Sequence, residues 1–504
     1  MAKTSLPRAE GFDKINDEVI AIDTKKGSMM WDEVSEALKN TDIQGWKRIT
    51  VEFGKAELEI IVPPQLEVLE MTEIPPLPDP QKAIDEALKH PIASPALQEI
   101  IKRKGRPPHQ ISVCIAVSDI TRPIPYQGKG GILLPLLRAL ETCNIKRENI
   151  MLLVATGMHR ASTEEEKVQM FGDEVMGRYP IKDHDCEDQA NLAYVGRTSR
   201  GTQVFIDKDF YRADLRITTG LVETHFMAGF SGGRKAICPG LVDKQTIERF
   251  HGPELLEHPL SANLVLEGNP CHEEALEIAQ AVGVAFTLNV TLNRDLKLTG
   301  IFAGDLVQAH LESCQKVREE VAILIDHPYD IVLTHAGYVG INHYQTAKAA
   351  VGALPAVKEG GTIIIAANNL DPEPIGGPEY KRLLHLLKMQ GPQGYLDLIR
   401  SPSWTFTKDQ WETEMWTKVM RRVSAERLIY CSPNIHSQGY KIIPGVSGYV
   451  YLGDEEMKKP LLERAQLMIQ RALIHAVYRI QRIGKEPTLA FIKEGPYAVP
   501  LFQS

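Results

Sequence analysis

The stretch ISVCIAVS at 111–118, followed by ILLPLLRALETCN at 132–144 and NIMLLVATG at 149–157, decides the fold class. The first and third segments are short and almost entirely apolar, which is typical of strands buried on both faces of a sheet. The middle segment has the apolar spacing of a helix. A strand, a helix and a second strand in succession form a βαβ unit, and this unit predicts a parallel sheet.

A similar pattern occurs later in the chain. YDIVLTHAG at 329–337 and GGTIIIAANN at 360–369 resemble buried strands, and YQTAKAAVGALPAV at 344–357 between them has a helical spacing. We therefore expect an α/β fold of two Rossmann-like domains, with parallel-rich sheets flanked by helices. The expected domains are an N-terminal α/β domain at 1–305 and a C-terminal α/β domain at 306–504, with the active site in the cleft between them. Further strands are expected at 57–62, 213–223, 284–293 and 489–495, and further helices from Asp79, at 305–325 and at 458–483.

Composition and charge exclude several classes of protein. Of the 504 residues, 43% are hydrophobic and 24% are charged, which is the usage of a folded globular protein. The net charge of −8 gives no reason to expect binding to nucleic acid or to an anionic membrane. We see no apolar run long enough to span a membrane and no signal peptide, so we expect a cytoplasmic protein. The seven scattered cysteines never form CxxC, which disfavours a disulfide framework and a zinc cage.

The first candidate loop follows the strand at 111–118, at the sheet edge where doubly wound folds bind ligands. It contains Asp119, Thr121 and Arg122, which offer a carboxylate, a hydroxyl and a planar guanidinium for a carboxylate or a phosphate. The alternative is that Asp119 only caps a helix and that Arg122 lies on the surface.

The second candidate loop follows the strand at 149–157 and contains His159 in the motif ATGMHR. Carboxyl ends of neighbouring parallel strands meet at one edge of a sheet, so we expect His159 near the loop that begins at Asp119. The residues that follow predict a capping box and a helix start at Ser162 or Thr163. A structural or exposed histidine is the alternative.

The segment ETHFMAGFSGGRK at 223–235 combines a histidine, four small residues and a terminal lysine. Small residues let the backbone approach a ligand closely, and His225 and Lys235 could act on it. The segment is not a P-loop, because Arg234 stands where Gly is required and Ala236 stands where a hydroxyl is required. No GxGxxG opens a helix after a strand, so a standard dinucleotide site is not expected. A flexible surface loop is the alternative.

Three further residues complete the candidate set. His251, in ERFHG, is more simply explained as a satisfied histidine at a helix end than as a metal ligand. Gln345 and Lys348, in YQTAK, are three residues apart and share one helix face. A lysine near a helix N-terminus opposes the helix dipole, which suggests that an anion binds there. A solvated lysine is the alternative.

Together these residues suggest a chemistry. Histidines suit acid and base roles near neutral pH, and two of them could serve opposite faces of a substrate, as a racemase requires. Acid–base catalysis contributes only about 10²–10⁴-fold, which is too little for breaking a C–H bond beside a hydroxyl. We therefore expect an electron-accepting cofactor, and Lys235 is an obvious residue to tether it.

The motifs SDITRPIP, ATGMHR, ETHFMAGFSGGRK, ERFHG and YQTAK resemble, in this order, the motif series of the lactate racemase family. The spacings from His225 to Lys235 and from Lys235 to His251 are also similar to those of the family. The family's cofactor is a nickel-pincer nucleotide, a pyridinium-3-thioamide-5-thiocarboxylic acid mononucleotide that carries nickel. The resemblance covers residues 110 to 350.

The resemblance implies a role for each candidate residue. It implies His159 and His225 as the acid–base pair, Asp119, Thr121, Arg122 and Lys235 as cofactor-binding residues, His251 as the nickel ligand, and Arg122, Tyr344, Gln345 and Lys348 as substrate-binding residues. Lys235 would hold the nucleotide through a thioamide. The implied reaction is inversion of the α-carbon of a 2-hydroxy acid by proton-coupled hydride transfer. The implied partners are the small-molecule substrate and the enzymes that make the cofactor; the oligomeric state stays open.

The chain is longer than is typical of the family, with an N-terminal extension and insertions within 371–416. Insertions of this kind could reshape the substrate side of the site, so we expect a larger hydroxy acid or a sugar acid in place of lactate. The alternatives are a hydroxyacid dehydrogenase or other oxidoreductase with a free nicotinamide, a noncatalytic protein that binds a hydroxy acid or a nucleotide, and a Schiff-base lysine enzyme.

Overall fold

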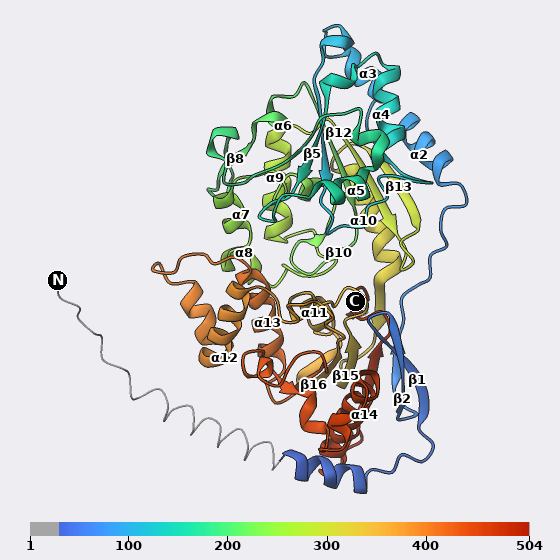
Figure 1. Ribbon diagram of the computed structural model, residues 1–504, viewed down its shortest axis with the longest axis vertical. Coiled ribbons are helices and arrows are strands. Elements are labelled where there is room, and N and C mark those ends of the chain that lie inside the picture. The colour runs from blue at the N-terminus through green and yellow to red at the C-terminus, as the bar shows by residue number, and fades with distance from the viewer. Residues whose placement is uncertain (1–29, 503–504) are drawn as a thin grey trace, which may run out of the picture. The chain divides into compact units, whose positions relative to one another are not determined.

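The computed structural model describes residues 30–502, and their contacts divide them into two compact units (Figure 1). Unit 1 comprises the described parts of Met1–Glu70 and Met415–Ser504, together with Leu324–Tyr395. Unit 2 comprises Met71–Ile323 and Leu396–Glu414. This division differs from a single boundary at residue 305, because the first described residues pack with the C-terminal part of the chain.

Unit 2 is built on a six-stranded sheet in the order β13-β12-β9-β4-β5-β6. Its strands are β4 (Val113–Ser118), β5 (Ile150–Ala155), β6 (Ile181–Asp183), β9 (Leu215–Leu221), β12 (Phe286–Leu292) and β13 (Leu298–Gly304). All neighbouring strands are parallel except the edge strand β13, which is antiparallel to β12. The strands expected at 111–118 and 149–157 are confirmed as β4 and β5, with the crossover helix α4 (Leu133–Thr142) between them.

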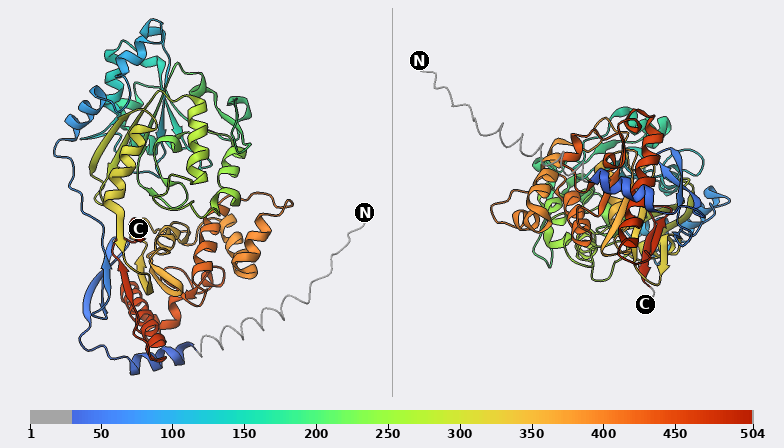
Figure 2. Two further views of the ribbon diagram at one scale, coloured as in Figure 1. Left: turned by 180° about the vertical axis from the view of Figure 1, so that it is seen from behind. Right: turned by 90° about the horizontal axis from the view of Figure 1, so that it is seen from below.

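Helices cover both faces of this sheet, as the two views from the front and from behind show (Figures 1 and 2). They are α2 (Pro80–Lys89), α3 (Leu97–Lys102), α4, α5 (Glu164–Met176), α6 (Lys208–Arg212), α7 (Lys244–Phe250), α8 (Pro253–Leu256), α9 (Pro270–Val282) and α10 (Gln308–Val321). A separate hairpin joins β7 (Leu192–Arg197) to β8 (Gln203–Asp207). Two expected helix starts are confirmed: Asp79 caps α2, and Thr163 forms a capping box with Glu166 at the start of α5.

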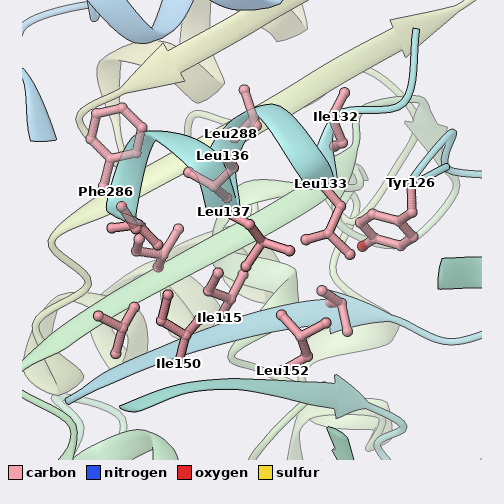
Figure 3. Packing of buried hydrophobic residues seen from close by; sticks show 14 of the residues in the cluster. Ile115, Tyr126, Ile132, Leu133, Leu136, Leu137, Ile150, Leu152, Phe286 and Leu288 are labelled. Carbon is pink, nitrogen blue, oxygen red and sulfur yellow. The ribbon is translucent and has the colours of Figure 1, made fainter. Parts of the chain in front are cut away.

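The core of unit 2 lies between α4 and the sheet (Figure 3). Leu133, Leu136 and Leu137 lie on the buried face of α4, and none of them is exposed to solvent. They belong to one cluster with Ile115 of β4, Ile150 and Leu152 of β5, and Phe286 and Leu288 of β12. Burial of each such side chain contributes about 1.5–3 kcal/mol, so this layer fixes the strand ends that carry the candidate site.

Unit 1 is built on a second six-stranded sheet, in the order β18-β17-β16-β15-β19-β3, and every strand pair in it is parallel. The strands are β3 (Glu67–Leu69), β15 (Tyr329–His335), β16 (Val357–Ala366), β17 (Leu428–Cys431), β18 (Val446–Ser447) and β19 (Leu489–Ile492). The second strand–helix–strand set is confirmed as β15, α11 (His343–Gly352) and β16.

The remaining elements of the chain complete the two units. They are a helix at 30–40, the antiparallel hairpin of β1 (Lys47–Phe53) and β2 (Ala56–Val62), α12 (Pro378–Ile399), α13 (Gln410–Arg422), α14 (Leu461–Gln481), and the paired strands β14 (Ala322–Ile325) and β20 (Val499–Phe502). The segment at 305–325, expected to be one helix, ends its helical part at Val321 and continues as β14.

Within residues 30–502, no helix is long and apolar enough to cross a membrane. All seven cysteines are free thiols.

Candidate active site

Loops after three neighbouring strands of unit 2 carry most of the candidate residues. β5, β4 and β9 lie side by side and parallel, so their carboxyl ends meet at one edge of the sheet. Asp119 follows β4 directly, His159 follows β5, and the glycine-rich segment at 223–235 follows β9. The expected proximity of His159 and Asp119 is present: His159 Nδ1 lies 2.6 Å from Asp119 Oδ2.

Asp119 is a buried carboxylate that fixes the His159 ring. Its Oδ1 accepts hydrogen bonds from the hydroxyl of Thr121 at 2.6 Å and from the Thr121 amide at 3.2 Å. Burial alone would raise the pKa of Asp119, but the hydrogen bonds from His159 and Thr121 and the charge of Arg122 lower it below its usual value. An ionised Asp119 draws the Nδ1 proton of His159 toward itself, so Nε2 is the nitrogen with which His159 can exchange a proton with a ligand.

Arg122 connects the loop after β4 to the loop after β9. Its Nη1 donates to Glu223 Oε1 at 3.0 Å, and both side chains are about two-thirds buried. Glu223 belongs to the glycine-rich motif, and no role was predicted for it from the sequence. In the structure it is the hydrogen-bond and ion-pair partner of Arg122. The remaining guanidinium N–H groups keep the planar donor geometry that suits a carboxylate.

His225 lies in a short hairpin formed by β10 (Thr224–His225) and β11 (Gly229–Phe230). Its Nδ1 accepts hydrogen bonds from the amides of Met227 at 3.2 Å and Ala228 at 3.3 Å, so the proton of the neutral ring lies on Nε2. The turn requires Gly229, which has a φ of +78° and leaves no room for a Cβ, because that atom would lie 2.1 Å from the Val265 carbonyl oxygen. The backbone therefore sets the position and the tautomer of His225.

The glycine-rich segment is buried and anchored, unlike a flexible surface loop. The Ser231 hydroxyl donates to the Leu221 carbonyl at 2.8 Å, and the Gly233 amide donates to Asn289 Oδ1 at 3.1 Å. Gly220 and Gly232 lie so close that a Cβ on Gly220 would be 3.0 Å from the Gly232 Cα. The small residues thus serve close packing of the segment on β9 and β12.

Lys235 follows this segment in a short 3-10 helix, Gly233–Ala236. Its Nζ lies 5.2 Å from the centre of the Phe250 ring. Burial, with the nearby charges of Arg122 and Arg234, lowers the pKa of Lys235 to about 7. A large fraction of this lysine is therefore an uncharged, nucleophilic amine at neutral pH.

His251 stands at the C-terminal end of α7 between two aromatic rings. Its Nδ1 donates to the Ile247 carbonyl at 3.1 Å, which leaves the lone pair on Nε2. The ring packs edge-on against Phe250 and lies 4.7 Å, centre to centre, from Trp411. Burial, followed by the charge of Lys235, lowers the pKa of His251 to about 3, so the ring stays neutral. Trp411 was not a candidate from the sequence. The feature that could have drawn attention to it is the presence of tryptophan within the insertion at 401–416.

These side chains fit a tethered, metal-bearing nucleotide. Lys235 offers an amine that reacts without first losing a proton, and His251 offers a neutral imidazole whose other nitrogen is held by a carbonyl, as is usual for a metal ligand. Within residues 30–502, no group of three or more His, Cys, Asp and Glu side chains is placed to hold a metal ion. A cofactor that brings its own sulfur ligands to the metal requires one protein ligand of this kind.

The other predicted residues, Tyr344, Gln345 and Lys348, lie in unit 1 in the first two turns of α11. Asn342 caps this helix, because its Oδ1 accepts the Gln345 amide at 3.0 Å. All three side chains are partly buried. The structure thus confirms that Gln345 and Lys348 belong to the start of a helix, where the dipole favours an anion.

Comparisons with known proteins agree with this fold and these side chains. The family model described as "Lactate racemase N-terminal domain" matches residues 53–263. The chain is 34% identical over 340 residues to the lactate racemase of Thermoanaerobacterium thermosaccharolyticum, an overlap of 67% of this chain and 76% of that protein. It is 33% identical over 342 residues to the lactate racemase of Lactiplantibacillus plantarum, an overlap of 68% of this chain and 77% of that protein.

Solved structures show the same likeness. The lactate racemase apoprotein of Thermoanaerobacterium thermosaccharolyticum aligns with a TM-score of 0.76 and 27% identity, over 90% of this chain and 100% of that one. A Thermotoga maritima protein at 16% identity shares the fold, with a TM-score of 0.59 over 84% of this chain and 99% of that one. The fold and the site define a two-unit α/β protein whose unit 2 carries a histidine–carboxylate pair and a buried lysine in loops that follow neighbouring strands of one sheet. The chain belongs to the lactate racemase family.

Proposed function

We propose that this protein is a racemase or epimerase that inverts the α-carbon of a 2-hydroxy acid, using a nickel-pincer nucleotide attached to Lys235. One observation carries the proposal: at one edge of the unit 2 sheet Asp119 holds His159 at 2.6 Å, and the charges of Lys235 and His159 both act on the neutral ring of His251. Membership of the lactate racemase family supports the reaction class.

In this proposal His159 is the acid–base residue for one enantiomer. Its Nε2 takes the proton of the substrate hydroxyl, and the buried Asp119 carboxylate stabilises the imidazolium that results. His225 is the acid–base residue for the other enantiomer and is held in the hairpin of β10 and β11; to take a proton on Nε2 its ring must first give up the tautomer that the Met227 and Ala228 amides favour. When bound, the cofactor supplies the acceptor and donor of the α-hydride.

Two residues hold the cofactor in the proposal. Lys235 would hold the cofactor through a thioamide, which would remove the entropy of cofactor dissociation, and His251 Nε2 would be the protein ligand to the nickel. Thr121 and Asp119 line the same loop and face the cofactor. The Ile247 carbonyl orients His251, and Trp411 covers one face of its ring and limits access of water to the metal ligand.

Arg122, Tyr344, Gln345 and Lys348 bind the substrate carboxylate in the proposal. Arg122 is already oriented by Glu223, and the start of α11 supplies a dipole that favours an anion. The longer chain favours a substrate larger than lactate. The part of the insertion at Leu396–Glu414 belongs to unit 2, where its Trp411 packs on the proposed metal ligand.

A substrate panel in deuterated buffer tests the proposal. Protein coexpressed with the cofactor-making enzymes is incubated with 2-hydroxy acids and aldonic acids, and product stereochemistry and α-deuterium content are measured. We expect inversion with retention of the α-hydrogen. Wash-in of solvent deuterium would indicate carbanion chemistry and would refute hydride transfer. Intact-mass and peptide mass spectrometry of the same protein must show the modification on Lys235.

A further inference from the structure

Arg234 is a completely buried cation beside the proposed cofactor lysine. Its side chain is among the largest in the described residues to be fully buried, at 1% exposure. Nη2 donates to the carbonyl oxygens of Ala228 at 2.9 Å and Phe230 at 3.0 Å, and Nη1 lies 2.7 Å from His310 Nε2. A guanidinium can only donate, whereas the Ser231 carbonyl oxygen, which lies 2.9 Å from the same Nε2 of His310, can only accept, so the two contacts require opposite tautomers of this ring.

The charge of Arg234 has no anion to compensate it in the described part of the chain. None of the three acceptors is a carboxylate, and the guanidinium Nε has no hydrogen-bond partner among the described residues. The thiols that lie nearest do not ionise at neutral pH, since burial raises the pKa of Cys314 to about 12 and that of Cys238 still further. Burial lowers the pKa of Arg234 to about 10, so it stays protonated at neutral pH. Such a buried, unpaired charge costs stability, and a functional reason for keeping it is therefore expected.

Arg234 also joins the two backbone segments that carry site residues. Ala228 and Phe230 belong to the hairpin that carries His225, while Arg234 itself lies in the 3-10 helix that carries Lys235. The two hydrogen bonds from one Nη2 atom therefore fix the spacing between the acid–base hairpin and the attachment point of the cofactor. A change of one ångström in such spacing can reduce a rate about 100-fold.

We propose that Arg234 is a positioning residue: its hydrogen bonds hold Lys235 at a fixed place beside the hairpin of His225, and its buried charge acts on the amine that attaches the cofactor. This inference rests on the proposed function of Lys235. Two cations in a buried loop repel one another, and only Arg234 is fixed by acceptors that require its protons, so Lys235 is the one that loses its proton. Condensation of the uncharged amine with a thiocarboxylic acid forms the C–N bond of a thioamide and releases the carbonyl oxygen as water, without any oxidant or reductant.

The other groups around Lys235 agree with this assignment. The charge of Arg122, from the loop after β4, lowers the pKa of Lys235 more than that of Arg234 does, and the thiols Cys238 and Cys271 would oppose it only if they were ionised. The Phe250 ring lies under the amine, and the neutral His251 follows it at the end of α7. The pKa of Lys235, lowered to about 7 by burial and by both arginines, is the expected consequence.

Carbamylation by cyanate tests the inference in the full-length protein without its cofactor. Cyanate adds, as isocyanic acid, only to an uncharged amine, so the rate at Lys235 divided by the concentration of isocyanic acid at each pH, measured by peptide mass spectrometry from pH 5 to 10, reports the proton on that residue. The exposed Lys55 in the same sample is the internal reference. In the wild type we expect this rate at Lys235 to level off above about pH 7, whereas the amine of an ordinary lysine, with a pKa of about 10.4, keeps gaining reactivity up to pH 10. A wild-type Lys235 that follows Lys55 would overturn the proposal without any variant.

Three variants separate the charge of Arg234 from its hydrogen bonds. Arg234→Gln removes the charge and should slow carbamylation of Lys235 at pH 6 by at least about 3-fold, which corresponds to half a pKa unit. Arg234→Lys keeps the charge and should retain the wild-type midpoint. Arg216→Gln is the control, because the Arg216 side chain also donates to backbone carbonyls, those of Gly283, Tyr211 and Ala213, and its charge is not among those that lower the pKa of Lys235.

The outcomes distinguish the inference from the proposed function. An unchanged midpoint in Arg234→Gln, or an equal shift in Arg234→Lys, would contradict a role for the charge. If Lys235 behaves as expected but the loaded protein inverts no hydroxy acid, the proposed function fails while the effect of Arg234 on Lys235 stands.

Discussion

Replacing Asp119 with Asn gives the sharpest test of the proposed acid–base pair. The change is nearly isosteric and keeps an acceptor oxygen for Thr121, but it removes the negative charge that faces His159 Nδ1 at 2.6 Å. His159 then loses the partner that stabilises its imidazolium and fixes the tautomer with Nε2 available. The expected effect is therefore a loss of turnover with little effect on the fold.

The size of the loss follows from the geometry of the pair. A hydrogen bond to a charged group contributes about 1.5–3 kcal/mol, which corresponds to about 10- to 150-fold in rate. The Asp119 side chain is only 8% exposed, but that of His159 is 53% exposed, so water screens part of the interaction. We therefore expect turnover of Asp119→Asn to fall about 10- to 100-fold.

Chiral chromatography of the product, at saturating substrate and in both directions, measures this turnover in cofactor-loaded protein. Asp183→Asn is the matched control, because Asp183 is also a poorly exposed carboxylate, bonded to the Ser162 amide at 2.9 Å and to Lys167 at 2.9 Å, and contacts neither histidine. Turnover within 3-fold of the wild type in Asp119→Asn, in a variant that keeps its cofactor, would refute the role given to this carboxylate.

Four further outcomes are expected. His251→Ala should lose bound nickel, measured by plasma mass spectrometry, while keeping the thermal midpoint of the apoprotein; full retention of nickel would disprove the ligand assignment. Gly229→Ala should lose at least about 2 kcal/mol in urea unfolding, because a Cβ there meets the Val265 carbonyl at a positive φ; a neutral result would show that the turn relaxes. Leu137→Ala should cost about 2–5 kcal/mol in the same assay, since the side chain is fully buried on the face of α4 that packs on the sheet. The folded pKa of Asp119 is lowered, so its contribution to stability is complete above about pH 4 and disappears as the pH falls through the folded pKa; the difference in unfolding free energy between Asp119→Asn and the wild type should therefore shrink from pH 7 to pH 3.

The strands and helices that position the site could be predicted from the sequence, because the consecutive residues of each element already show which of its side chains are apolar. A strand covered on both faces, such as β4, is apolar at nearly every position. The capping box of Thr163 and Glu166 spans only four consecutive residues. The pairing of β3 with β19 could not be predicted, because the partner of a short strand is chosen by packing across the whole sheet.

The candidate site divides in the same way. The contact of His159 with Asp119 follows from parallel order, since both residues begin loops at the same sheet edge. The packing of Trp411 on His251 joins residues 160 positions apart, and no periodicity in the insertion signals it. It could not be predicted either that Arg234 has no carboxylate partner among the described residues. Its position beside Lys235 in the sequence does not show that its acceptors are carbonyl oxygens and an imidazole nitrogen.

The pairing of β3 with β19 also has a consequence for biosynthesis. Residues 67–69 must wait for residues 490–492 to leave the ribosome before their sheet can close, a delay of roughly 20 to 85 seconds at common elongation rates. Unit 2 has by then been synthesised completely, as two insertions within unit 1, Met71–Ile323 and Leu396–Glu414. The nascent chain therefore exposes an unpaired N-terminal strand through most of translation, and even a small C-terminal truncation that removes β19 would leave that strand permanently without its neighbour.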